Sequence, residues 1–116
     1  MGKKFSIEQA ASSTAIKNKS SILAKFFKNL ILSQFRKINH GCIILNEGNQ
    51  KIVFGDQSST LKAEVNVYSD EFYILAGSGG DLGIAEAYAA GYWDADDMVK
   101  LIQIVIKNQE VQKSLE

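Results

Sequence analysis

The chain has 116 residues, of which 46% are apolar and 22% are charged, with one cysteine and no proline. This length suits one domain around a single hydrophobic core, and no apolar run approaches the roughly 20 residues that a membrane-spanning helix needs. No apolar stretch typical of a signal peptide follows Lys3 and Lys4, and the lone Cys42 has no disulfide partner, so we expect a cytoplasmic setting.

The formal net charge of zero conceals an asymmetry between the two parts of the chain. Residues 1–40 contain eight basic residues against one acid, Glu8, for a net charge of +7. Residues 41–116 contain five lysines and twelve acids, for a net charge of −7. A basic front segment of this kind favours contact with anionic surfaces.

The order of segments predicts one domain. We expect residues 1–19 to form a basic N-terminus that is flexible or weakly helical, residues 20–112 to form a single α+β domain, and residues 113–116 to be a tail. A terminal tail could belong to the natural chain or be an addition to it.

Apolar residues recur every three or four positions from Ser20 to Ile38, which predicts an amphipathic helix. The stripe consists of Ile22, Leu23, Phe26, Phe27, Leu30, Ile31, Phe35 and Ile38. Its polar side and the residues just before it are basic, through Lys17, Lys19, Lys25, Lys28, Arg36 and Lys37. Two interpretations stay open, because such a helix can pack on a core or lie on anionic lipid. The membrane-contact candidates are these six basic residues together with Phe26 and Phe27.

After His40 the apolar period changes to two, which predicts strands. Cys42 to Leu45 and Lys51 to Phe54 flank a turn rich in Asn and Gly, and Leu61 to Tyr68 alternates apolar with polar residues. We therefore expect an antiparallel sheet of three or more strands with one solvent-facing side.

Two short helices and a longer one complete the prediction. Ser69 and Asp70 are expected to cap a helix from Glu71 to Ala76, and glycines 77, 79 and 80 to form a turn before a helix from Leu82 to Ala90 that ends at Gly91. The last helix is expected to reach about Gln109, with an apolar stripe of Met98, Leu101, Ile102 and Val105.

No group of residues composes a catalytic or metal site. Asp94, Asp96 and Asp97 resemble the start of a calcium loop, but Val99 and Val105 occupy the positions of its glycine and glutamate, so helix capping explains them better, with Asp94 accepting from the Asp97 amide. The glycine run lacks the spacing of a nucleotide-binding loop. His40 and Cys42 have no third partner, and we expect Glu86 to tie its helix to neighbouring hydrogen-bond donors.

One long motif carries a family resemblance. Gly80-Asp81-Leu82-Gly83-Ile84-Ala85-Glu86-Ala87-Tyr88, then Gly91-Tyr92-Trp93-Asp94 and Asp96-Asp97-Met98, resembles a signature of the cyclopropane-fatty-acyl-phospholipid synthase family. The resemblance covers about residues 20 to 110 and departs from the family pattern at Ala89-Ala90 and Tyr92. Its motif residues are Gly80, Asp81, Gly83, Glu86, Tyr88, Gly91, Trp93, Asp96 and Asp97.

The resemblance implies the N-terminal domain of a bacterial S-adenosylmethionine-dependent methyltransferase, without its catalytic domain. The order of the predicted elements is also similar to the sterol-carrier-protein fold. Because the catalytic domain is absent, the resemblance implies no enzyme activity or cofactor in this chain, with S-adenosylmethionine bound by the absent domain. The implied partners are anionic phospholipid at the inner membrane face and the methyltransferase domain, with no nucleic acid. A free-standing lipid carrier and a structural or homodimerising module remain alternatives.

Overall fold

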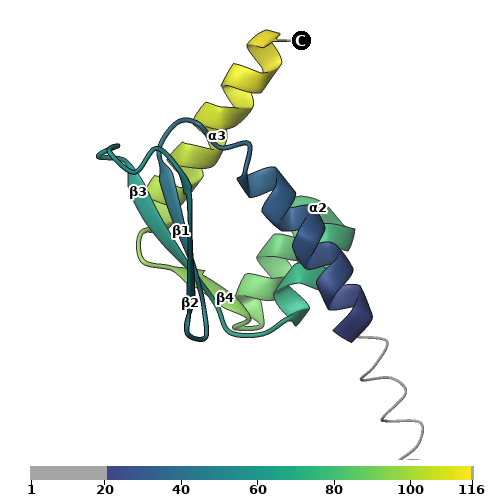
Figure 1. The fold of residues 1–116 in the computed structure, drawn as a ribbon. Coiled ribbons are helices and arrows are strands. Elements are labelled where there is room, and N and C mark those ends of the chain that lie inside the picture. Colours follow the sequence, from purple (N-terminus) through teal and green to yellow (C-terminus); the bar gives the residue numbers. More distant parts are fainter. Residues whose placement is uncertain (1–20, 116) are drawn as a thin grey trace, which may run out of the picture.

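The structure, a computed structural model, describes residues 21–115, with side chains described through residue 110. A first helix over residues 21–35 is followed by β1 (Cys42–Glu47), β2 (Gln50–Gly55), β3 (Lys62–Val67), α2 (Glu71–Ala89), β4 (Trp93–Ala95) and α3 (Met98–Leu115). The sheet lies at one side, the first helix passes along α2, and α3 extends past the end of the sheet (Figure 1). The predicted α+β class is confirmed.

The four-stranded sheet is mixed, with the order β2-β1-β3-β4. β1 pairs antiparallel with β2 but parallel with β3, and β4 pairs antiparallel with β3. The prediction of a purely antiparallel sheet was therefore wrong. β1 is the most apolar strand and takes a central position, whereas β2, which begins with Gln50 and Lys51, remains at the edge.

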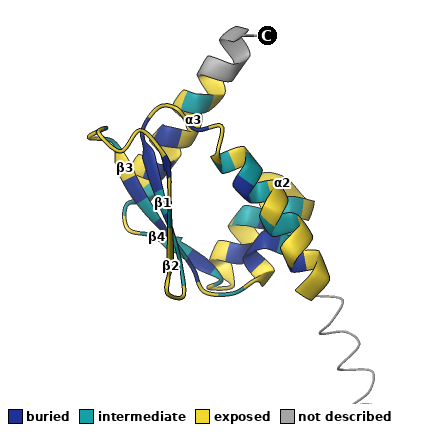
Figure 2. Cartoon of the chain, in the orientation of Figure 1, coloured by how far each residue is buried: buried dark blue, intermediate teal, exposed yellow. Residues whose placement is uncertain are grey.

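One face of the sheet forms the core. Ile43, Leu45, Ala63, Val65 and Val67 are all at most 4% exposed, which confirms the alternation predicted for the third strand. The helices cover this face, and buried residues of the sheet and of the helices meet there (Figure 2).

The opposite sheet face carries a hydrogen-bonded row of polar side chains. The amide of Asn46 donates to Glu64 and Asn66 at 3.0 Å each. Asn66 donates in turn to Asp94 at 2.8 Å, and the Tyr68 hydroxyl donates to the same carboxylate. The row links β1, β3 and β4 and satisfies polar groups that stand opposite the core.

α2 comprises two helices that meet at a sharp kink, which confirms the two predicted helices but replaces the predicted turn over residues 77–80 with a break at Gly80 alone. Gly80 has φ +58° and ψ −138°, which L-residues with a side chain rarely adopt, and the helix continues on both sides of it. The predicted end at Gly91 is confirmed, because the Gly91 and Tyr92 amides donate to the carbonyls of Tyr88 and Ala87. At the other end, the Ser69 hydroxyl accepts from the Glu71 amide at 3.2 Å, whereas Asp70 makes no side-chain capping bond.

α3 packs on the sheet through only part of the predicted stripe, since Met98 and Leu101 pack in the core as predicted. Leu101 and Ile104 are buried, whereas Ile102 is 50% and Val105 is 38% exposed. Apolar residues occupy seven of the nine positions from 98 to 106, so their spacing alone does not fix which face turns inward. Further along, the Asn108 amide joins the backbone of Asn39 and His40 to α3.

Candidate functional site

The first helix has apolar residues on two opposite faces. Ala24 and Leu32 are buried against the domain, and Phe27, Ile31 and Phe35 pack partly against the core. Ile22, Phe26 and Leu30, spaced four residues apart, remain 69%, 62% and 43% exposed. With 100° of rotation per residue, these three positions centre about 160° from Ala24, Lys28 and Leu32. Together with Leu23, 48% exposed, they form what we call the outer strip.

Charged residues near the outer strip are basic. Lys25, Arg36 and Lys37 are exposed, and the sequence contains no acidic residue between Glu8 and Glu47. Lys17 and Lys19, which the sequence also predicted as contacts, lie outside the described residues. The outer strip thus combines apolar side chains with uncompensated positive charge, as helices that lie in a membrane interface do.

Lys28, by contrast, is tied to the domain. Its ammonium group lies 2.9 Å from a carboxylate oxygen of Glu47 and 5.4 Å from the centre of the Tyr73 ring. The Tyr73 hydroxyl donates to the same Glu47 oxygen at 2.6 Å. This triad joins the first helix, β1 and α2, so Lys28 has a structural role that its position in a basic helix did not predict.

The structure places Phe26 and Phe27 in different environments, although their rings touch edge to face with centres 5.2 Å apart. Phe27 turns inward and lies so close to Gly77 of α2 that a β-carbon at Gly77 would collide with its ring. Phe26 turns away from the core. The glycine at position 77 therefore permits the first helix to approach α2 closely.

The glycines of the motif shape α2. A β-carbon at Gly83 would collide with the carbonyl oxygen of Leu75, which lies one bend earlier in the same helix. Gly80 provides the bend itself, and Gly91 has φ +81° after the end of the helix. All three glycines are therefore needed for the backbone geometry of α2 and of the turn that follows it.

The aromatic residues of the motif pack around the end of α2. Trp93 is 6% exposed, and its indole N–H donates to the Ile84 carbonyl at 2.9 Å. Tyr88 is half exposed and stacks edge to face on Trp93, with ring centres 5.4 Å apart. Asp81 and Glu86 are exposed, which corrects the expectation that Glu86 ties its helix to neighbouring donors.

The aspartates have structural roles that differ in detail from the prediction. Asp97 accepts from the Lys100 amide at 3.1 Å and so caps α3, whereas Asp94 belongs to β4 and does not cap the helix. Asp96 accepts from the amides of Glu64 and Asp97 at 2.7 and 2.8 Å, which fixes the start of α3 to the sheet. Within residues 21–115 no cluster of three potential metal ligands is found.

An apolar groove of about 620 Å³ runs between α2 and α3. Trp93 and Leu101 form its inner part, α2 forms one wall, and the exposed apolar residues of α3 form the other. We call it the α2–α3 groove; its walls include Ile84, Ala85, Tyr88, Ile102, Val105 and Ile106.

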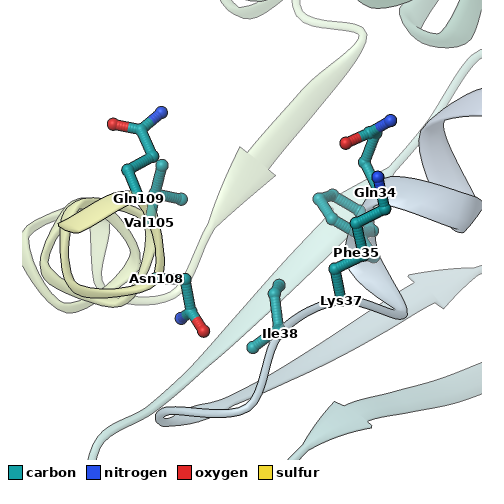
Figure 3. A pocket seen from close by; sticks show the side chains of 7 residues that line it. All are labelled: Gln34, Phe35, Lys37, Ile38, Val105, Asn108 and Gln109. Carbon is teal, nitrogen blue, oxygen red and sulfur yellow. The ribbon is translucent and has the colours of Figure 1, made fainter. Parts of the chain in front are cut away.

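A smaller hollow of about 200 Å³ lies on the other side of Val105. Phe35 at the end of the first helix and Ile38 just after it line the hollow from one side, and α3 lines it from the other, through Asn108 (Figure 3). The hollow thus lies between the end of the first helix and α3.

Neither the groove nor the triad was predicted from the sequence. The groove depends on which apolar residues of α3 face outward, and this depends on how the helix is rotated about its axis when it packs on the sheet. The triad joins residues 19 and 26 positions apart, and only Glu47, the first acid after Glu8, is conspicuous in the sequence.

Comparisons with known proteins found no relative of this chain. A scan against protein-family models found no match, and searches of curated proteins and of solved structures found none either. Within the described residues, no helix combines the length and apolar character needed to cross a bilayer.

Proposed function

We propose that this chain is a non-catalytic domain that engages phospholipid at a membrane surface. The observation that carries the proposal is the outer strip, which presents Ile22, Phe26 and Leu30 to solvent on the face of the first helix turned away from the core. Fully burying one such side chain is worth about 1.5–3 kcal/mol, so a bilayer interface would stabilise this face.

Positive charge supplies the second part of the interaction. Each basic residue close to an anionic membrane contributes roughly 1 kcal/mol, and this attraction weakens as salt screens it. Lys25 lies within the outer strip's span, and Arg36 and Lys37 follow the helix. We therefore expect reversible binding that needs both anionic lipid and apolar contact.

The resemblance to cyclopropane-fatty-acyl-phospholipid synthases gives the proposal its setting. In that setting the domain works at the inner face of the cytoplasmic membrane and presents phospholipid acyl chains to a separate methyltransferase domain, which binds S-adenosylmethionine. The basic front of the chain agrees with such a role, since the cytoplasmic leaflet is anionic.

Two alternatives make different demands on the structure. A structural module that packs its whole apolar stripe on the core would bury Phe26, which is 62% exposed, whereas a dimerising module would cover it with a second copy that carries the same positive charges. A free-standing lipid carrier would enclose its ligand, whereas the apolar space here is an open groove. The outer strip favours membrane docking over both.

Vesicle co-sedimentation tests the proposal. The wild type should sediment with phosphatidylglycerol-containing vesicles at low salt, less at high salt, and weakly with pure phosphatidylcholine vesicles. The double variant Lys25→Glu, Lys37→Glu should lose most of this binding, whereas Lys107→Glu, an exposed lysine on α3, is the control and should bind like the wild type. Equal loss in both variants, or no wild-type binding, would refute docking through the first helix.

A further inference from the structure

The α2–α3 groove has the dimensions of a ligand site. Its volume of about 620 Å³ falls within the 300–1,000 Å³ typical of small-molecule pockets. Its α3 wall runs from Met98 to Gln109, about 18 Å at 1.5 Å per residue. This length slightly exceeds one leaflet of a bilayer, whose whole hydrocarbon core is about 30 Å thick.

The chemistry of the groove fits an alkyl chain. Its polar lining groups are the Asp81 carboxylate, the Gln109 amide and the Tyr88 hydroxyl, and the Trp93 indole N–H is already bonded to the Ile84 carbonyl. A phosphate or sugar in this groove would lose hydrogen bonds to water and regain few, which makes its burial costly. An alkyl chain has no such groups to satisfy.

The groove also has apolar surface that nothing in the described part of the chain covers. Ile102, Ile106 and Tyr88 are each about half exposed, at 50%, 49% and 51%. They stand on opposite walls around the Trp93 ring. One chain inserted between them would cover all three and contact the indole.

Charge distinguishes a phospholipid chain from a free fatty acid. Among the described residues, those that line the groove include no lysine or arginine, and Asp81 is its one charged residue. The carboxylate of a fatty acid would find no cationic partner and would meet an acid at the Asp81 end. A phospholipid can place one acyl chain in the groove and keep its head group outside.

We propose that the α2–α3 groove binds a single acyl chain of a phospholipid. The choice of a phospholipid rests on the membrane role proposed above, whereas the choice of an alkyl chain rests on the groove itself. The groove is separate from the outer strip, so docking and acyl-chain binding are two activities of different surfaces.

Trp93 provides the test, because it is the only tryptophan in the chain and it lines the groove. Bromine atoms on an acyl chain quench indole fluorescence at contact. The wild type is titrated with a lysophosphatidylglycerol carrying a 9,10-dibromostearoyl chain, below its micelle concentration, and separately with dibromostearic acid. We expect saturable quenching by the lysophospholipid and at least tenfold weaker quenching by the fatty acid.

Matched variants locate the site. Ile102→Asp places a charge on the groove wall and should weaken quenching at least tenfold, and Ala85→Phe, which fills the groove, should do the same. Val99→Asp changes an exposed apolar residue of α3 outside the groove and should leave quenching unchanged. Circular dichroism of each variant confirms folding. Absence of quenching, or equal quenching in Ile102→Asp and the wild type, would overturn the proposal.

The same variants separate this proposal from membrane docking. Ile102→Asp should sediment with phosphatidylglycerol vesicles like the wild type. A wild type that sediments but is not quenched would refute the groove and leave docking intact. A wild type that is quenched but does not sediment would refute docking and leave the groove as an acyl-chain site.

Discussion

The Tyr73 hydroxyl donates a hydrogen bond to the Glu47 carboxylate at 2.6 Å, at the point where the first helix, the sheet and α2 meet. Lys28 approaches the same oxygen at 2.9 Å. Burial raises the pKa of Tyr73 and the bond to Glu47 raises it further, so the phenol stays a donor. The triad fixes the inward face of the first helix and thereby determines that Phe26 faces outward.

The triad predicts that stability falls in acid. Burial alone would raise the pKa of Glu47, but the hydrogen bonds from Tyr73 and Lys28 outweigh it and hold this pKa below its usual value. The stabilisation is therefore complete above the unfolded pKa of about 4.3 and is lost as pH falls through the folded pKa. Urea unfolding of the wild type and Glu47→Gln should show a free-energy difference at pH 7 that shrinks toward pH 3. A difference that grows in acid would contradict this assignment.

The two lysines of the first helix should behave differently. Lys28→Met leaves the partly buried Glu47 carboxylate without its cation and should cost about 1–2 kcal/mol of unfolding free energy. Lys25→Met, at an exposed position three residues earlier, should change stability by less than about 0.5 kcal/mol. Chemical denaturation of both variants at pH 7 measures this, and equal effects would remove the structural role given to Lys28.

Two glycines of α2 form a matched pair. A methyl group at Gly83 would collide with the Leu75 carbonyl, and Gly83→Ala should cost about 2 kcal/mol or more. At Gly79 nothing lies within 4 Å of an added β-carbon, and Gly79→Ala should stabilise the helix by roughly 0.5–1 kcal/mol. Thermal unfolding of both variants gives the comparison. Stabilisation by Gly83→Ala would contradict the close approach of Gly83 to the Leu75 carbonyl.

The cap of α3 can be tested by two substitutions at Asp97. Asp97→Ala removes the acceptor for the Lys100 amide and should destabilise the protein by about 1 kcal/mol, whereas Asp97→Asn, which keeps an acceptor, should cost much less. Equal losses in the two variants, measured by urea unfolding, would show that the charge of Asp97 matters more than the capping bond.

The sequence predicted the elements better than their arrangement. The strands from Cys42 to Val67 were predicted because alternation and turn residues are local signals, whereas the parallel pairing of β1 with β3 depends on which strand occupies the centre. The kink at Gly80 was predicted as a turn, because glycine is common in kinked helices and in turns alike. For the first helix the apolar stripe was wide enough to suggest two uses, and only the packed structure shows which of its residues pack inward and which stay exposed.

The predicted contact residues divide in the same way. Phe26, Lys25, Arg36 and Lys37 lie exposed, as a membrane surface requires, whereas Phe27 and Lys28 turn inward to Gly77 and Glu47. Helical periodicity places Phe26 and Phe27 only 100° apart, so it could not assign them to opposite environments.

The central claim is that the outer strip carries membrane binding, and one comparison tests it most directly. Phe26→Asp and Leu82→Asp each place a carboxylate at a largely exposed apolar position, at 62% and 70% exposure, on the first helix and on α2 respectively. In co-sedimentation with phosphatidylglycerol vesicles at low salt, Phe26→Asp should reduce the bound fraction at least tenfold, and Leu82→Asp should leave it close to the wild-type value. Wild-type binding by Phe26→Asp would contradict the account.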